Sequence, residues 1–135
     1  MEEVEFVNWD ELLILHEDQL RKHGGQAGFI DEGVVRSAMS RPQFTAQYSP
    51  DADMADLAAD YMYGLSTTQG FLDGNKRTAL VTALFFMRKN GCNIFLSEKL
   101  MYFIALAVAK GDLDRDGLAE ILRTHMEWLD GPESP

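Results

Sequence analysis

Cysteine is almost absent from this chain, since Cys92 is the single cysteine among 135 residues. One cysteine forms no internal disulfide and no cysteine cluster for zinc, which fits a reducing compartment. Long hydrophobic runs are also missing, because the apolar stretches fall well short of the roughly 20 residues that span a bilayer. The first residues, Met-Glu-Glu-Val-Glu, are acidic, unlike the basic start of a signal peptide. We therefore expect a cytoplasmic protein without a membrane segment.

Positive charge is scarce as well. The 12 Lys and Arg residues face 22 Asp and Glu residues, which gives a formal net charge of -10. Nucleic-acid backbones favour basic surfaces, so we do not expect direct binding to nucleic acid. A small local group of cations, such as Lys76 and Arg77, could still hold the phosphates of a single nucleotide.

Apolar residues, in contrast, make up 46% of the chain, enough for one compact domain with its own core. Their spacing is helical nearly throughout, and strand alternation is weak. The sequence therefore predicts an all-α, single-domain helical bundle over residues 1–130, followed by a frayed tail at 131–135. The predicted helices run over about 9–23, 32–41, 53–68, 75–90, 98–109 and 118–129.

The expected helix boundaries rest on caps and breakers. Asn8, with Glu11 three residues later, has the pattern of a capping box. Pro42 is expected to end the second helix, because the residue before a proline avoids the helical region. We expect loop over 43–53 and a short extended piece over 93–96.

The first helix is expected to bury one apolar stripe. Leu12, Leu15 and Leu20 point toward the core in this interpretation, and Leu13 and Ile14 widen the apolar face.

The stretch Asp112 to Gly117 resembles the beginning of a calcium-binding loop. The twelfth position of such a loop requires a bidentate glutamate, and here it is Arg123, which repels a cation. We therefore interpret the stretch as an acidic turn that caps the last helix.

The predicted helix over 75–90 is apolar almost all round, so it belongs in the middle of the bundle. The first N–H groups of a helix have no partner within it, and Gly74 lets the backbone approach a ligand closely. Asn75 can cap the helix or donate its amide to an oxyanion, while Lys76 and Arg77 add positive charge. Together these residues are typical of a phosphate site.

Asp73 is unusual beside an anion site, because its carboxylate repels a phosphate. A magnesium ion between the two removes that conflict, since magnesium favours one or two carboxylates plus substrate phosphates. The residues alone leave open the alternative of an ordinary Asp-Gly-Asn turn with solvated charges. Phe71 is expected to anchor the turn in the core.

The stretch GFLDGNKRTAL resembles the signature of the Fic/Doc family, and DGNKRTA is similar to its death-on-curing (Doc) branch. The resemblance continues in LLILHEDQLRKHGG, GFIDEGVVRSAMSRPQ, the whole segment LAADYMYGLSTTQGFLDGNKRTALVTALFFMRKNG around the motif, and AVAKGDLDRDGLAEILRTH. It covers the chain from Phe6 to about His125.

This resemblance implies a small helical toxin of a toxin–antitoxin pair with a buried central helix. Its activity would be Mg-ATP-dependent phosphorylation of a Ser or Thr of elongation factor Tu, and an antitoxin would cover the active-site groove with its C-terminal segment. Carried over by position, Asp73 would hold Mg²⁺, Gly74 and Asn75 would form the anion hole, and Lys76 and Arg77 would contact the phosphates. The AMP-transferring group of the family has glycine at the position of Lys76 and arginine at that of Leu80, so both residues favour phosphoryl transfer over AMP transfer.

Gln69 departs from the family, which has a histidine there as general base; Gln69 and Asn75 are thus the expected catalytic positions. An amide cannot accept a proton near neutral pH as an imidazole can. Gln69 is either a substitution that disables a toxic enzyme, or the native residue of a weak or dead enzyme kept for binding antitoxin, or a sign that another group is the base. The remaining histidines are His16, His23 and His125; we expect His16 on the surface of the first helix, from which it could approach the site.

Overall fold

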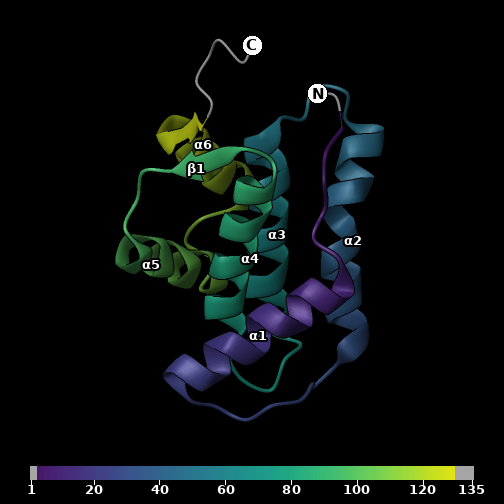
Figure 1. The fold of residues 1–135 in the computed structure, drawn as a ribbon, viewed down its shortest axis with the longest axis vertical. Helices are drawn as coiled ribbons and strands as arrows, with labels where there is room; N and C mark the ends of the chain where they lie inside the picture. Colours follow the sequence, from purple (N-terminus) through teal and green to yellow (C-terminus); the bar gives the residue numbers. More distant parts are fainter. Residues whose placement is uncertain (1–2, 130–135) are drawn as a thin grey trace.

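The computed structural model describes residues 3–129, within which six helices and two short strands form a helical domain (Figure 1). The predicted frayed tail at 131–135 lies outside the described residues. The all-α bundle expected from the sequence is confirmed, apart from the small sheet. The elements are α1 (Trp9–His23), α2 (Glu32–Tyr48), α3 (Met54–Thr68), α4 (Asn75–Lys89), β1 (Cys92–Ile94), α5 (Glu98–Ala109), α6 (Arg115–His125) and β2 (Met126–Trp128).

Side-chain caps begin several of these helices. The Asn8 carboxamide accepts a hydrogen bond from the Glu11 N–H at 2.8 Å, and Glu11 accepts one from the Asn8 N–H at 2.9 Å, so the predicted capping box is present. The Asp31 and Ser97 side chains also accept hydrogen bonds from N–H groups in the first turns of α2 and α5. These local bonds satisfy N–H groups that a helix cannot pair internally.

Helix α4 lies in the middle of the bundle, packed against α1, α3, α5 and β1 (Figure 1). Its inward residues Ala79, Ala83, Phe86 and Met87 are fully buried. The expected central helix is therefore confirmed, and its two ends are held at fixed places in the protein. Among the described residues, no helix has both the length and the apolar character that crossing a membrane requires.

Helix α2 continues past Pro42 to Tyr48, so the prediction of a helix end at Pro42 is wrong and the predicted loop over 43–53 is confirmed only for 49–53. A proline inside a helix costs about 3 kcal/mol, because it removes one backbone hydrogen bond and crowds the preceding turn. Tertiary packing offsets this cost. Pro42 is itself buried, and a Cβ atom on Gly64 of α3 would lie only 3.1 Å from the Cβ of Ala38, so the two helices are in close contact.

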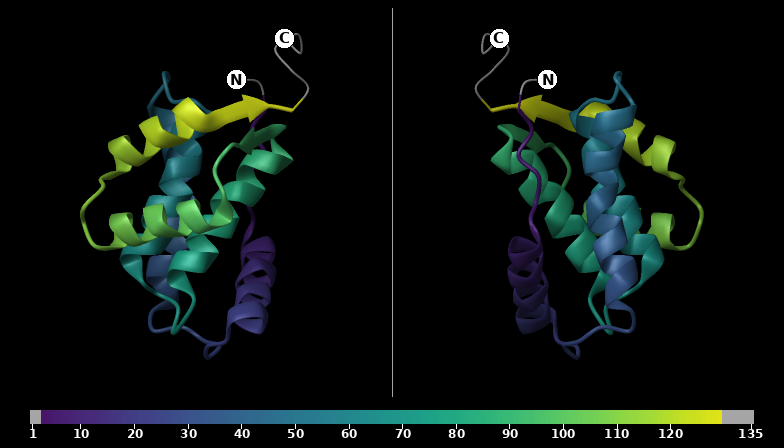
Figure 2. Two further views of the ribbon diagram at one scale, coloured as in Figure 1. Left: turned by 90° about the vertical axis from the view of Figure 1, so that its left-hand side faces the viewer. Right: turned by 90° about the vertical axis from the view of Figure 1, so that its right-hand side faces the viewer.

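The C-terminal part also differs from the prediction. Helix α6 begins at Arg115 and ends at His125, whereas the sequence suggested a helix over 118–129. The residues after His125 instead form β2, which pairs antiparallel with β1 through Cys92 and Trp128. Figure 2 shows β2 across the end of the molecule opposite to the α1–α2 connection. Pairing satisfies the backbone groups of β1 that would otherwise form an open edge.

The acidic stretch before α6 is a helix cap, as interpreted from the sequence. Asp114 accepts a hydrogen bond from the Gly117 N–H at 2.8 Å. Arg123, which occupies the position of the missing calcium ligand, forms an ion pair with Asp53 at 2.7 Å. The charges of this stretch therefore have structural partners.

Candidate active site

The segment over 69–74, called the motif loop here, joins α3 to α4. Gln69 ends α3 in the left-handed region with φ 51° and ψ 46°, which is uncommon for a residue with a side chain. Gly70 passes so close to α2 that a Cβ atom there would lie 2.5 Å from Val35 and 2.6 Å from Val34. Gly74 then caps α4 with φ 82°. The path of the loop thus depends on glycine at two points.

The connection between α1 and α2 runs beside the motif loop and holds it (Figure 1). The Gly70 carbonyl accepts a hydrogen bond from the Ile30 N–H at 2.7 Å, and the Leu72 N–H donates to the Gly28 carbonyl at 2.9 Å. The backbone N–H of Gln26 donates to the Asp73 carboxylate at 2.7 Å. These bonds fix both the backbone of the loop and one carboxylate oxygen of its acidic residue.

Asn75 fastens the other side of the loop. Its side chain accepts a hydrogen bond from the Phe71 N–H and donates one to the Phe71 carbonyl. Because Gly74 occupies the cap position, the expectation that Asn75 might cap α4 is wrong. No side chain caps this helix, so its first N–H groups remain available to a ligand. Phe71 is 1% exposed, which confirms its expected place in the core.

A cavity of about 180 Å³ opens at the start of α4. Helix α1, the motif loop, α4 and α5 all contribute to its lining. The residues that line it are Gln19, His23, Gly24, Gly25, Asp73, Gly74, Asn75, Lys76, Arg77 and Tyr102. The structure therefore brings together the five expected site residues from Asp73 to Arg77, whereas Gln69 is exposed and does not line this cavity.

A second cavity, of about 240 Å³, adjoins the first between α1, α4 and α5. The two share four lining residues, Gln19, His23, Arg77 and Tyr102. The second cavity also has Lys22, Leu80, Val81, Glu98 and Lys99 in its wall. Together they form one groove lined largely by polar side chains, several of them cationic.

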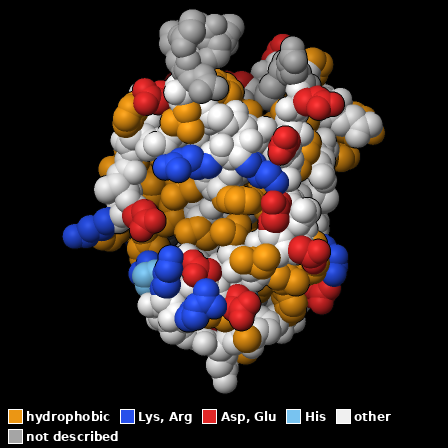
Figure 3. Space-filling model, viewed as in Figure 1, with side chains coloured by type: hydrophobic (Ala, Val, Ile, Leu, Met, Phe, Trp, Pro, Cys, Tyr) orange, Lys and Arg blue, Asp and Glu red, His pale blue; other side chains and the backbone are white. Residues whose placement is uncertain are grey.

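Arg77 lies at the junction of the two cavities. Its guanidinium carbon is 4.3 Å from the centre of the Tyr102 ring, and Nη1 is 3.4 Å from Nε2 of His23. In the part of the chain that the structure describes, no salt bridge joins Lys76 or Arg77 to a carboxylate. Among the described residues, neither cation therefore has an ion-pair partner within 4 Å, although Asp73 and Glu98 line the same groove. On the face shown in Figure 3, Lys and Arg side chains gather around a histidine at the lower left.

The ligands around Asp73 suit a magnesium ion that is bound together with a nucleotide. Residues 3–129 contain no group of three His, Cys, Asp or Glu side chains able to hold a metal by themselves. Magnesium bound with a nucleotide needs only one or two carboxylates, because phosphates supply further oxygen ligands. Asp73, whose carboxylate accepts a hydrogen bond from the Gln26 N–H beside the uncapped start of α4, fits that arrangement.

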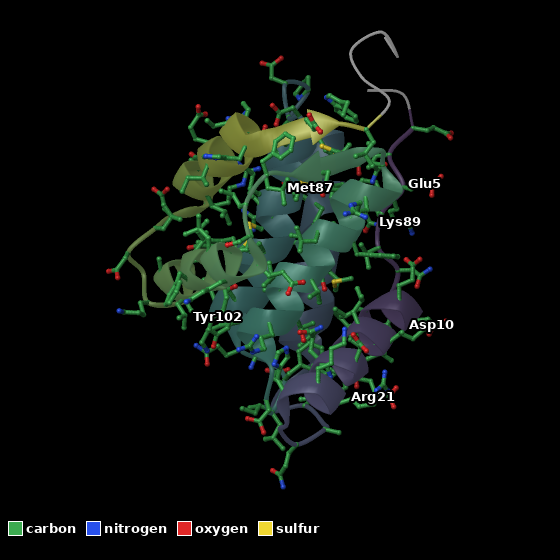
Figure 4. The ribbon with its side chains drawn as sticks, turned by 60° about the vertical axis from the view of Figure 1, so that its left-hand side comes forward. Glu5, Asp10, Arg21, Met87, Lys89 and Tyr102 are labelled. Carbon is green, nitrogen blue, oxygen red and sulfur yellow. The ribbon has the colours of Figure 1, made fainter. Side chains whose placement is uncertain are left out.

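Several residues at the groove were missed by the sequence analysis. His16, which was expected at the surface, is buried, while Leu13 and Ile14, expected to widen the apolar face, are exposed. The stripe that α1 buries consists of Leu12, His16 and Gln19, and it continues to His23 in the cavity wall. The available signal was the helical spacing of polar residues in line with Leu12. Tyr102 belongs to α5, and its side chain, labelled in Figure 4, lies beside the start of α4. No local sequence pattern indicated that Tyr102 lines the cavity.

Comparison with known proteins adds an independent observation. A profile of the Fic/DOC family matches residues 6–87, which contain the motif loop and most of α4. The chain is 32% identical to the protein kinase doc of Escherichia phage P1 over 114 residues, or 84% of this chain and 90% of that protein. It is 35% identical to the toxin Doc of Mycolicibacterium smegmatis (strain ATCC 700084 / mc(2)155) over 104 residues, or 71% of this chain and 76% of that protein.

Proposed function

The chain belongs to the Fic/Doc family, and we propose that it is the toxin of a toxin–antitoxin pair, built for phosphoryl transfer from Mg-ATP to a protein hydroxyl. The target in this proposal is a Ser or Thr of a translation factor, elongation factor Tu by resemblance. The observation that carries the proposal is the groove at the start of α4, where uncapped helical N–H groups lie beside two cations that form no ion pair with the described residues.

Each residue of the site has a part in this proposal. The N–H groups at Gly74 and Asn75 form the anion hole for the phosphates, and Lys76 and Arg77 neutralise their charge. Asp73 holds the magnesium ion, which offsets charge on the phosphate oxygens. Catalysis then consists of positioning and electrostatic stabilisation, as is general for phosphoryl transfer.

The base is the weak part of this site. Gln69 stands where the family has histidine, and its amide cannot take a proton from a hydroxyl near neutral pH. His16 is a poor replacement, because its Nε2 is already bonded to the Asp73 carbonyl oxygen at 2.9 Å. We therefore propose that this chain is slower than a histidine-containing relative by about 100- to 10,000-fold, the usual effect of losing a positioned base.

Gln69 also supports a second candidate function, that of a catalytically dead module that binds antitoxin. Binding to a groove needs shape and charge but no base, and the groove between α1 and α5 keeps both. In either case the partner is an antitoxin whose C-terminal segment covers the groove, ordering as it binds.

Intact-mass spectrometry of elongation factor Tu tests the proposal. The factor is incubated with ATP and magnesium together with either this chain or its Gln69→His variant. A phosphate-sized gain with the variant, and little or none with the parent, supports a kinase disabled by Gln69. A gain the size of AMP instead shows AMP transfer by the same site. No gain with either protein, combined with tight binding of a cognate antitoxin, supports the binding module.

A further inference from the structure

His16 makes two close contacts beneath the motif loop. Its ring stacks on that of Phe71 with centroids 3.7 Å apart and planes inclined by 14°. Its Nε2 lies 2.9 Å from the carbonyl oxygen of Asp73. Because a carbonyl oxygen can only accept, Nε2 carries the hydrogen and donates. The side chain is only 6% exposed, so water competes little for this bond.

The bond determines how the peptide between Asp73 and Gly74 is oriented. This peptide is trans, and a trans peptide directs its C=O and N–H in opposite directions. With the Asp73 carbonyl turned toward His16, the Gly74 N–H turns away from it. His16 is absent from the cavity lining, whereas Gly74 is part of it. The Gly74 N–H is thus placed on the ligand side.

The local chain does not enforce this orientation. Gly74 has φ 82° and ψ 17°, the values of the third residue of a type II turn. Type I and type II turns differ by a rotation of the central peptide, here the one between Asp73 and Gly74. Glycine adopts either sign of φ at little cost, so the residue that permits the observed turn permits the alternative as well. In that alternative the Asp73 carbonyl would face the anion.

We propose that His16 is a positioning residue of this site, which holds the Asp73 carbonyl so that the Gly74 N–H faces the nucleotide phosphates. The proposal rests on the function proposed above for the groove. The imidazole is held in place by a column of rings, in which Phe71 packs on Phe29 at 5.1 Å and Phe29 on Trp9 at 5.9 Å, with Arg36 over Trp9 at 3.9 Å. The donor is therefore oriented before any ligand arrives.

Two matched variants distinguish the effect of the hydrogen-bond donor at His16 from the effect of its aromatic ring. In His16→Gln the side-chain amide reaches about as far as Nε2, whereas in His16→Asn it is one methylene shorter and fails to reach the carbonyl. Ile14→Ala, at an exposed position of the same helix, serves as a control that leaves both the ring column and the His16–Asp73 bond in place. Far-UV circular dichroism verifies that each variant is folded.

The first measurement is NMR of the ligand-free proteins. Nitrogen-15 shifts of the parent should show His16 with its hydrogen on Nε2, and the parent should show a strong contact between Asp73 Hα and the Gly74 amide hydrogen, as a type II turn requires. In His16→Asn this contact should weaken while the Asp73 and Gly74 amide hydrogens approach each other. A parent His16 with its hydrogen on Nδ1, or an unchanged turn in His16→Asn, would overturn the proposal.

The second measurement is calorimetric binding of Mg-ATP. We expect His16→Asn to bind about tenfold more weakly or worse, and both His16→Gln and Ile14→Ala to stay within about threefold of the parent. Equal affinity of His16→Asn and the parent, or equal loss in His16→Gln and His16→Asn, contradicts the positioning role. A parent that binds no Mg-ATP contradicts the proposed function instead, and the NMR result still decides whether His16 sets the turn.

Discussion

Asn75 binds the backbone of Phe71 twice: its Oδ1 accepts from the Phe71 N–H, and its Nδ2 donates to the Phe71 carbonyl, both at 3.0 Å. The first residue of α4 thereby holds the buried aromatic residue of the motif loop four positions earlier. Asn75 is 9% exposed, so neither bond is easily replaced by water. Its main observed contribution is to the shape of the motif loop.

Replacing Asn75 by alanine should therefore damage both stability and binding. We expect Asn75→Ala to lower the free energy of unfolding by about 1–3 kcal/mol, because buried backbone groups lose their partners. Binding of Mg-ATP should weaken about tenfold or more. Asn90→Ala is the control, since Asn90 makes comparable bonds to Glu5 and Phe86 at the other end of the helix. It should lose stability in urea unfolding yet keep its affinity in calorimetry; equal affinities of the two variants contradict the prediction.

Arg77 offers a direct test of the phosphate site. Its guanidinium has no carboxylate partner among the described residues and lines both cavities. Charge-assisted bonds contribute about 1.5–3 kcal/mol each, so Arg77→Ala should weaken Mg-ATP binding roughly 10- to 100-fold. Arg88→Ala, at the far end of the same helix, should leave it unchanged. If the Arg77→Ala protein binds Mg-ATP as tightly as the parent, the nucleotide does not bind in this groove.

Local chemistry made much of the fold predictable. The cap at Asn8 and the central helix depend on neighbours in the sequence, and the structure has both. The course of α2 past Pro42 was not predictable in this way. It depends on close contact with Gly64 of another helix, which overrides the local cost of proline.

The same division applies to the site. The run from Asp73 to Arg77 is contiguous and follows a turn, so its gathering at one cavity could be predicted from sequence. His16 and Tyr102 reach the site only through the packing of α1 and α5 on α4. From the sequence alone, His16 could not be told from an ordinary histidine on a helix surface. Its role becomes visible only when the structure shows the partner of its ring nitrogen.

The backbone conformation of Gln69 predicts that replacing it by glycine stabilises the protein. Its left-handed conformation costs a residue with a Cβ atom about 1 kcal/mol relative to glycine. Gln69→Gly should therefore raise the free energy of unfolding by about that amount, and should stay inactive because it supplies no base. Thr68→Gly, within the helix, should lower stability by about 0.5–1 kcal/mol. Urea unfolding of both variants measures the contrast, and a loss in both would show that Gln69 is not strained.

Gly70 predicts the opposite effect for a different reason. An added Cβ atom would lie 2.7 Å from the Asp31 carbonyl oxygen and closer still to two valine side chains. Because backbone cannot give way easily, Gly70→Ala should destabilise the protein by about 2–3 kcal/mol, as overpacking does. Gly111→Ala is the control, because its φ of 84° is strained but the space is open, and it should cost about 1 kcal/mol. Thermal and urea unfolding should rank Gly70→Ala below Gly111→Ala; the reverse order contradicts the close approach of the loop to α2.

The Asp53–Arg123 ion pair should make stability depend on pH in the acid range. Hydrogen bonds from Arg123 lower the pKa of Asp53 from 3.8 to about 2, against the opposing effect of partial burial. A lowered carboxyl pKa stabilises the folded state fully above pH 3.8, and this contribution is lost as pH falls toward 2. The Asp53 side chain is 47% exposed, so solvent screening reduces the contribution to about 1 kcal/mol.

Asp53→Asn isolates this charge, because asparagine can still cap α3 as Asp53 does. A double-mutant cycle with Arg123→Met should give a coupling free energy of about 1 kcal/mol at pH 7. Arg123 also bonds to Asp56 and Glu120. Arg123→Met removes these bonds whether residue 53 is Asp or Asn, so their contribution cancels in the cycle. Repeated in urea at several values between pH 5 and pH 2, the coupling should decline toward zero at the acid end. A coupling that stays constant over this range would mean that Asp53 titrates alike in the folded and unfolded chains, and that the pair holds α6 to α3 without its charge.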